Sequence, residues 1–60
     1  MKLTPKKVKG IRKKLGLTQV ELAAKLGVAF ATVNRWENGQ CEPSPLASKM
    51  MRMMLIMEEV

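Results

Sequence analysis

The chain has 60 residues, a length that allows one domain with a small core to which a partner would add stability. Apolar residues make up 47% of it, which is too many for a disordered tail, and with no histidine and a single cysteine, Cys41, a structural zinc site and an intrachain disulfide are excluded. The net charge is +6, and most of the basic residues lie in the first fourteen positions. This charge favours a polyanionic partner, nucleic acid or an anionic membrane surface, although a solvated helix face would look the same.

Several other classes of protein are also disfavoured by composition. Without histidine or aspartate, and with no glycine-rich phosphate loop, the chain offers no acid–base or nucleophile pair, so we expect neither an enzyme nor a bound cofactor or metal. No apolar run approaches the ~20 residues of a membrane span. The first fifteen residues are too charged for a signal peptide, and we therefore expect a cytoplasmic protein.

The first predicted helix begins after Thr4, an N-cap residue followed by Pro5 at the first helical position, and ends at Gly16. Its expected buried stripe consists of Val8, Ile11 and Leu15. A separate basic stripe consists of Lys6, Lys9 and Lys13. Cations in the first turn oppose the helix dipole, which favours a binding role for them.

The second predicted helix has the clearest start in the sequence. Thr18 and Glu21 have the spacing of a capping box, and Gly27 stands where a left-handed residue closes a helix. The residues expected to face inward are Leu22, Ala23 and Leu26.

A third helix is predicted from about Phe30 to Glu37, with Gly39 as its stop. Val33 and Trp36 share its inner face, and we expect Trp36 in the core. The opposite face, at i, i+3, i+4, i+7 spacing, carries Ala31, Asn34, Arg35 and Asn38. Ala29 is a poor N-cap, so the first backbone N–H groups are left for water or an anion.

The last predicted helix spans about residues 45–58, with Ser44 as N-cap and Pro45 at its first position. We expect its core face to be formed by Leu46, Met50, Met53, Met54 and Met57. Met51 and Leu55 form a second strip, which we interpret as a dimer contact. No segment alternates with period two, so no strand is expected.

Together these elements predict an all-α, compact four-helix domain over residues 1–60. Two short helices joined by a tight glycine turn, at about residues 18–38, have the geometry of a helix-turn-helix. In that arrangement Gly27 reverses the chain, small Ala23 lets the helix axes approach, and the outer face of the third helix is free to enter a groove.

The sequence LTQVELAAKLGV, followed by TVNRWENG and PSPLA, resembles the Xre/Cro family of phage and bacterial transcriptional regulators. The similarity covers residues 11–47 and implies a lambda-repressor-like DNA-binding fold. Relatives usually carry a fifth helix, and the present domain is expected to lack it.

The resemblance also implies roles for particular residues. Gln19 corresponds to a glutamine that binds backbone phosphate and steadies the recognition helix. Phe30, Ala31 and Arg35 align with base-contacting positions. Neighbouring phosphate or base contacts align with Thr32 and Asn34, and the phosphate-facing loop aligns with Asn38 and Gly39. Arg12 and Glu37 match an ion pair that ties the first helix to the third.

The sequence departs from the family pattern at Phe30 and Ala31, where polar residues are common. Apolar groups there can contact only a thymine methyl, so base reading rests heavily on Arg35, which can form a bidentate pair with guanine. Phe30 has an alternative, which is to fold back over the second helix.

The resulting prediction is operator binding by a transcriptional repressor, as a homodimer on a palindromic site with half-sites roughly 34 Å apart. The alternative is a protein-binding module, such as an antitoxin whose last helix holds a toxin and whose DNA binding serves autoregulation. A third possibility, a basic membrane-surface anchor, is disfavoured by the narrow apolar stripe of the first helix.

Overall fold

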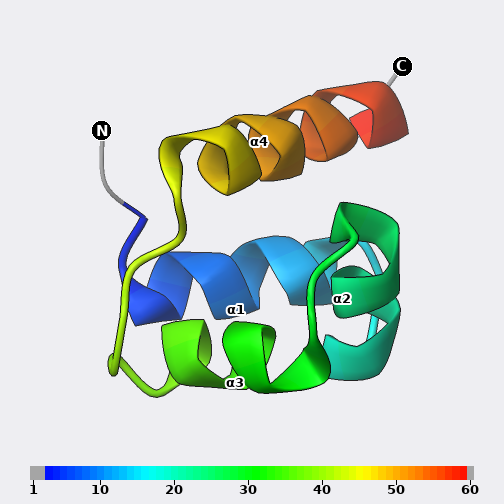
Figure 1. The fold of residues 1–60 in the computed structure, drawn as a ribbon. Helices are drawn as coiled ribbons and strands as arrows, with labels where there is room; N and C mark the ends of the chain where they lie inside the picture. Colours follow the sequence, from blue (N-terminus) through cyan, green and yellow to red (C-terminus); the bar gives the residue numbers. More distant parts are fainter. Residues whose placement is uncertain (1–2, 60) are drawn as a thin grey trace.

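The computed structural model describes residues 3–59 of the chain. Lys2, one of the basic residues in the first fourteen positions, therefore lies outside the described residues. Four helices follow one another, α1 (Pro5–Lys14), α2 (Gln19–Leu26), α3 (Phe30–Glu37) and α4 (Pro45–Glu59) (Figure 1). Within the described range no residue is in a strand. The all-α fold with a helix-turn-helix is confirmed.

The helices begin where capping side chains satisfy backbone N–H groups that have no partner inside the helix. Thr4 Oγ1 accepts a hydrogen bond from the Lys7 amide at 3.2 Å, and Ser44 Oγ accepts one from the Ala47 amide at 3.1 Å. At α2 the predicted capping box is complete. The Glu21 amide donates to Thr18 Oγ1 at 3.1 Å, and the Thr18 amide donates to Glu21 Oε1 at 2.8 Å. These three predicted N-caps are confirmed.

Gly27 makes the turn between α2 and α3. Its φ is +72°, in the left-handed region where a side chain would be strained, and its N–H closes α2 on carbonyls of the preceding turn. A short connection follows, and α3 begins at Phe30. The sharp reversal predicted for this position is confirmed.

The core lies where the inner faces of the helices meet. Its fully buried side chains come one from each helix: Val8, Leu22, Val33 and Met51. Trp36 is 4% exposed, so the predicted inner face of α3 is confirmed. In Figure 1, α1 lies between α3 and α4, and α2 closes one side. Accordingly, α3 packs on α1 and α2, and α4 packs on the same two helices.

The predicted orientation of α4 is wrong in part. Met50 and Met54 pack against the core as expected. Met51 is fully buried and lies in the core beside Ala47 and Ser48, whereas Leu46, Met53 and Met57 are exposed. Leu55 is half-buried. Met51 therefore cannot serve as a surface contact for a second copy. The physical reason is that α4 is apolar around most of its circumference, and the small Ala47 and Ser48 allow that side to approach α1 and α2 most closely.

Candidate nucleic-acid interface

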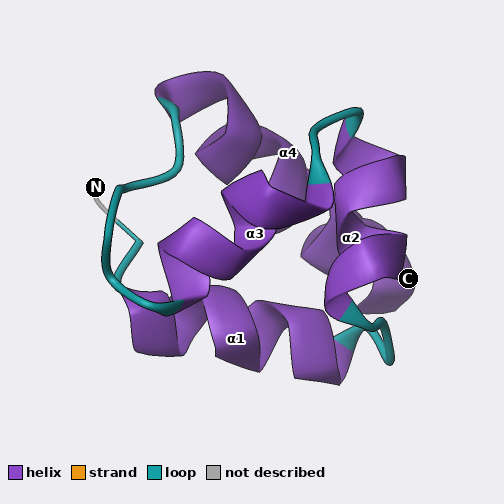
Figure 2. Ribbon diagram, turned by 60° about the horizontal axis from the view of Figure 1, so that its bottom comes forward, coloured by secondary structure: helices purple, strands orange, loops and turns teal. Residues whose placement is uncertain are grey.

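The inner face of α3 is fixed by packing and by charge. Val33 and Trp36 are buried in the core. Glu37, the last residue of α3, is also buried. In Figure 2, α3 crosses the molecule between α1 and α2. The burial of this inner face therefore fixes the orientation of α3 and leaves its opposite face exposed to solvent.

Arg12 of α1 and Glu37 of α3 form a two-point ion pair. Arg12 Nε donates to Glu37 Oε2 at 2.6 Å, and Arg12 Nη2 donates to Glu37 Oε1 at 3.1 Å. Their side chains are 15% and 2% exposed, respectively. Arg12 Nη1 also donates to the Leu17 carbonyl at 3.0 Å, which ties the α1–α2 connection to the same point. The ion pair implied by the family resemblance is confirmed.

Gln19 is a third member of this cluster. Its Nε2 donates to Glu37 Oε1 at 3.1 Å, so the first residue of α2 is hydrogen-bonded to the last residue of α3. The family resemblance implied a phosphate contact for Gln19. The hydrogen bond to Glu37 was not predicted, because no local spacing links positions 19 and 37. The side-chain amide of Gln19 has a second N–H that could donate to a phosphate, and this contact stays a prediction.

The pKa of Glu37 lies below its ordinary value. Burial by itself raises this pKa, but hydrogen bonds from Arg12 and Gln19, together with the charges of Arg12 and Lys9, outweigh burial and lower it. Glu37 is therefore a carboxylate at neutral pH.

The outer face of α3 has no comparable anchoring. Ala31, Arg35 and Asn38 are exposed, while Thr32 and Asn34 are half-buried. The N-cap residue Ala29 makes no side-chain hydrogen bond to the helix, as predicted. These positions thus form one accessible strip along α3, although their contacts with DNA stay a prediction.

Phe30 begins α3 and is 49% exposed. It belongs neither to the buried core cluster nor to the half-buried side chains packed against that cluster. Of its two predicted placements, folding back into the protein is therefore disfavoured, and the ring remains accessible at the start of α3.

Exposed basic side chains lie along α1: Lys6, Lys7, Lys9 and Lys13. The charge of Lys9 acts on Glu37 of α3, whereas Lys7 lines a hollow together with Arg52 and Leu55 of α4. Positive charge of this kind attracts a phosphate backbone.

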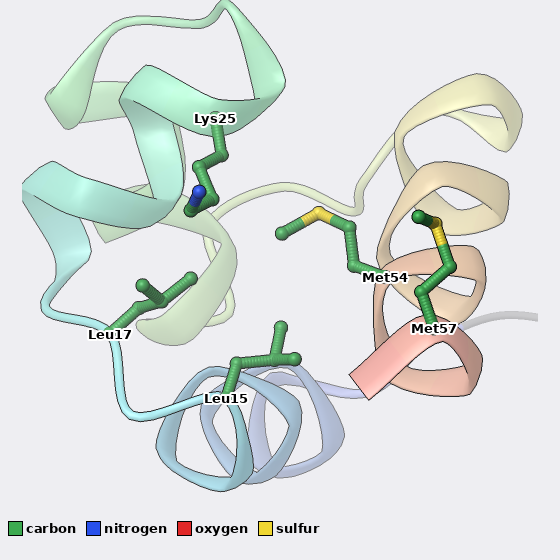
Figure 3. A pocket seen from close by; sticks show the side chains of 5 residues that line it. All are labelled: Leu15, Leu17, Lys25, Met54 and Met57. Atoms are coloured by element: carbon green, nitrogen blue, oxygen red, sulfur yellow. The ribbon is translucent and has the colours of Figure 1, made fainter. Parts of the chain in front are cut away.

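A second feature lies between α2 and α4. It is a hollow of about 330 Å³ lined by Leu15, Leu17, Lys25, Met54 and Met57. Figure 3 shows the Lys25 side chain directed into the same space as Leu17 and Met54. On α4, Met53 and Met57 also line a neighbouring hollow beside Lys25. The exposed large apolar side chains of α4 are Leu46, Met53, Ile56 and Met57.

Among the residues that the structure describes, no group of three or more histidine, cysteine, aspartate or glutamate side chains could hold a metal ion. No helix in the same part of the chain is long and apolar enough to cross a membrane.

Comparison with protein families identifies the kind of domain that the chain forms. A family model described as helix-turn-helix matches residues 8–53, which is more than half of the chain and includes α2, α3 and the turn between them. A search of curated proteins finds no match.

Proposed function

Because the chain belongs to the Xre/Cro-type helix-turn-helix family of DNA-binding regulators, we propose that it recognises a specific operator with α3 in the major groove and represses transcription there. The observation that carries this proposal is the contrast between the two faces of α3. Val33, Trp36 and Glu37 hold its inner face, while Arg35 extends from the outer face as an exposed cation.

Arg35 is the residue best suited to read a base. Its planar guanidinium can donate two parallel hydrogen bonds to guanine O6 and N7, and this rigid fork is more specific than the rotatable ammonium of a lysine. The phosphate contacts come from residues around it and position the helix. We assign this role to Gln19, Thr32, Asn34 and Asn38, the free backbone N–H groups after Ala29, and the α1 lysines.

The test compares Arg35→Ala with Arg35→Lys on an operator and on random DNA of equal length, at one stated salt concentration. We expect Arg35→Ala to weaken operator binding by about 1–3 kcal/mol and to relax base preference at one position. Arg35→Lys retains the charge but loses the rigid fork of the guanidinium, so it should lose operator preference while keeping affinity for random DNA. Equal losses on both DNAs would make Arg35 a phosphate ligand and contradict the assignment.

We further propose that two copies bind one palindromic operator. A single recognition helix reaches only a few base pairs, and two helices related by a two-fold axis read half-sites roughly 34 Å apart. Met51 is excluded from the interface by its burial. The exposed side chains of α4, Met53 and Met57 among them, replace it as the proposed contact, because exposed apolar patches mark association surfaces.

Sedimentation of the Met53→Glu/Met57→Glu double variant tests this interface. We expect a monomer that keeps its fold and binds a half-site, but that loses affinity for the full palindrome. The matched control is Lys49→Glu, an exposed position on the same helix. A dimer that persists in the double variant would exclude this face as the interface.

The same exposed face of α4 also favours a second candidate function, in which the domain holds a different protein, such as a toxin, and DNA binding serves autoregulation. The two candidates differ in one measurement. A homodimeric repressor binds its full operator when purified alone, whereas a domain that needs a partner protein gains operator affinity only when that partner is added.

A further inference from the structure

The two ends of the outer face of α3 differ in chemistry. At the start, the three successive residues Ala29, Phe30 and Ala31 are all exposed, and none has a polar side chain. The polar side chains Asn34 and Arg35 follow about one turn later. The surface proposed to face DNA thus begins with three exposed apolar residues, and the polar side chains Thr32, Asn34 and Arg35 follow them.

The major groove offers few partners for an apolar side chain. Base edges there present hydrogen-bond donors and acceptors, and the only apolar group among them is the methyl group at C5 of thymine. An aromatic ring pressed against an amino group, a carbonyl or a phosphate would remove water from that group without replacing its hydrogen bond, which is unfavourable. For a half-exposed phenylalanine at the start of a recognition helix, the favoured partner is therefore the C5-methyl group of a pyrimidine.

We propose that Phe30, together with the methyl group of Ala31, forms a contact for the C5-methyl group of a pyrimidine in the major groove. This inference rests on the proposed placement of α3 and specifies the ligand at its N-terminal end, where recognition helices contact base edges. The contact selects thymine over cytosine at one position of each half-site, while Arg35 selects guanine.

A consequence extends beyond the sequence of the operator. 5-Methylcytosine carries its methyl group on the same ring atom as thymine and faces the same groove. A site with cytosine at this position is therefore bound poorly when unmodified and better when that cytosine is methylated. The exposed apolar residues at the start of α3 make the domain sensitive to cytosine methylation at one base pair per half-site.

The experiment uses the full chain and an operator recovered by selection from random DNA. Each thymine is replaced in turn by uracil, which removes only the methyl group and leaves the hydrogen-bonding edge unchanged. We expect one position per half-site at which uracil weakens binding roughly fourfold, the effect of losing about one buried methyl contact. Cytosine at that position should bind more weakly than thymine, and 5-methylcytosine should recover a roughly fourfold gain over cytosine.

Two variants assign the effect to Phe30. Phe30→Ala should lose most of the difference in affinity between the thymine and uracil operators, because only the methyl group of Ala31 remains to contact the base. Val20→Ala is the matched control, since Val20 of α2 is also an exposed apolar side chain, at 61% against 49% for Phe30, and belongs neither to the proposed DNA contacts nor to the proposed interface on α4. It should retain the full response to the methyl group. Circular dichroism confirms that both variants are folded, as expected for positions outside the core.

Two results would overturn the inference. The first is a wild-type protein that binds every uracil operator as tightly as the thymine operator. The second is a methyl response that is undiminished in Phe30→Ala, which would place the methyl contact on a residue other than Phe30. In both cases a selected operator exists and the proposed function stands. A selection that yields no preferred sequence would instead contradict the proposed function, and the methyl contact with it.

Discussion

Helices α3 and α4 differ in how sharply each separates an apolar side from a polar side. In α3, apolar Val33 and Trp36 lie opposite polar Asn34, Arg35 and Asn38, so one side of the helix must be buried. In α4, methionine, leucine and isoleucine occupy most of the circumference, and either of two apolar sides could face the core. Helix α3 has a defined outer face because its two sides differ in polarity. The orientation of α4 is set instead by close packing against α1 and α2.

The most severe way to break this arrangement is to remove the anchor of α3. Trp36→Ala should destabilise the domain by about 3–5 kcal/mol, because it deletes a large buried side chain from a small core. The total stability of a 60-residue domain is itself only about 3–9 kcal/mol, so the variant should be largely unfolded. Urea unfolding followed by circular dichroism measures this. Its counterpart on the other face, Arg35→Ala, should change stability by less than about 0.5 kcal/mol.

A matched pair on α4 tests how that helix is oriented. Met51→Ala should cost about 2–5 kcal/mol because Met51 is fully buried, and Met53→Ala should cost less than about 0.5 kcal/mol because half of that side chain is exposed. Thermal unfolding of the two variants gives the comparison directly. Equal losses would mean that both sides of α4 contribute equally to the core, contrary to the packing described above.

The Arg12–Glu37–Gln19 cluster links three helices and should respond to acid. Glu37→Gln replaces the carboxylate partner of the largely buried Arg12 with a neutral amide, so the charge-assisted hydrogen bonds are lost, and we expect a loss of about 2 kcal/mol at neutral pH. Because the pKa of Glu37 is lowered in the folded state, its carboxylate contributes stability above the unfolded pKa, and this contribution is lost as the pH falls through the folded pKa. Unfolding measured between neutral pH and strong acid should therefore show wild type losing its advantage over Glu37→Gln. A constant difference across that range would contradict the assignment.

The smallest expected effects come from the two helix starts of the helix-turn-helix. Thr18→Ala removes the capping-box hydroxyl of α2 and should cost about 1 kcal/mol. Ala29→Asp supplies the cap that α3 lacks and should stabilise the domain by about 1 kcal/mol, while its negative charge beside the phosphates weakens DNA binding. Thermal unfolding and a binding titration separate the two effects. An increase in both thermal stability and DNA affinity would place Ala29 away from DNA.

The sequence predicted those features that depend on local chemistry. Capping residues Thr4, Thr18 and Ser44 and the turn residue Gly27 act within a few positions of themselves, so their roles could be inferred without knowing the tertiary packing. The burial of Trp36 followed from the contrast between the two sides of α3. The family resemblance added the Arg12–Glu37 pair, which no local pattern indicates.

Features that depend on packing between distant segments were beyond local reasoning. The burial of Met51 was predicted wrongly, because the apolar pattern of α4 does not distinguish its two sides. The hydrogen bond from Gln19 to Glu37 was missed, because eighteen positions separate the two residues along the chain. Likewise, the accessibility of Phe30 was left open by the sequence, and its exposure in the folded chain now favours a contact with DNA.

Selection of bound sites from a random DNA pool, at a stated salt concentration, tests the central claim that the outer face of α3 reads DNA. The account predicts a two-fold symmetric site whose half-sites contain a guanine that is no longer enriched with Arg35→Ala and a thymine that is no longer enriched with Phe30→Ala. A pool that shows no enrichment, or one whose enriched sequence is unchanged by both variants, would contradict it.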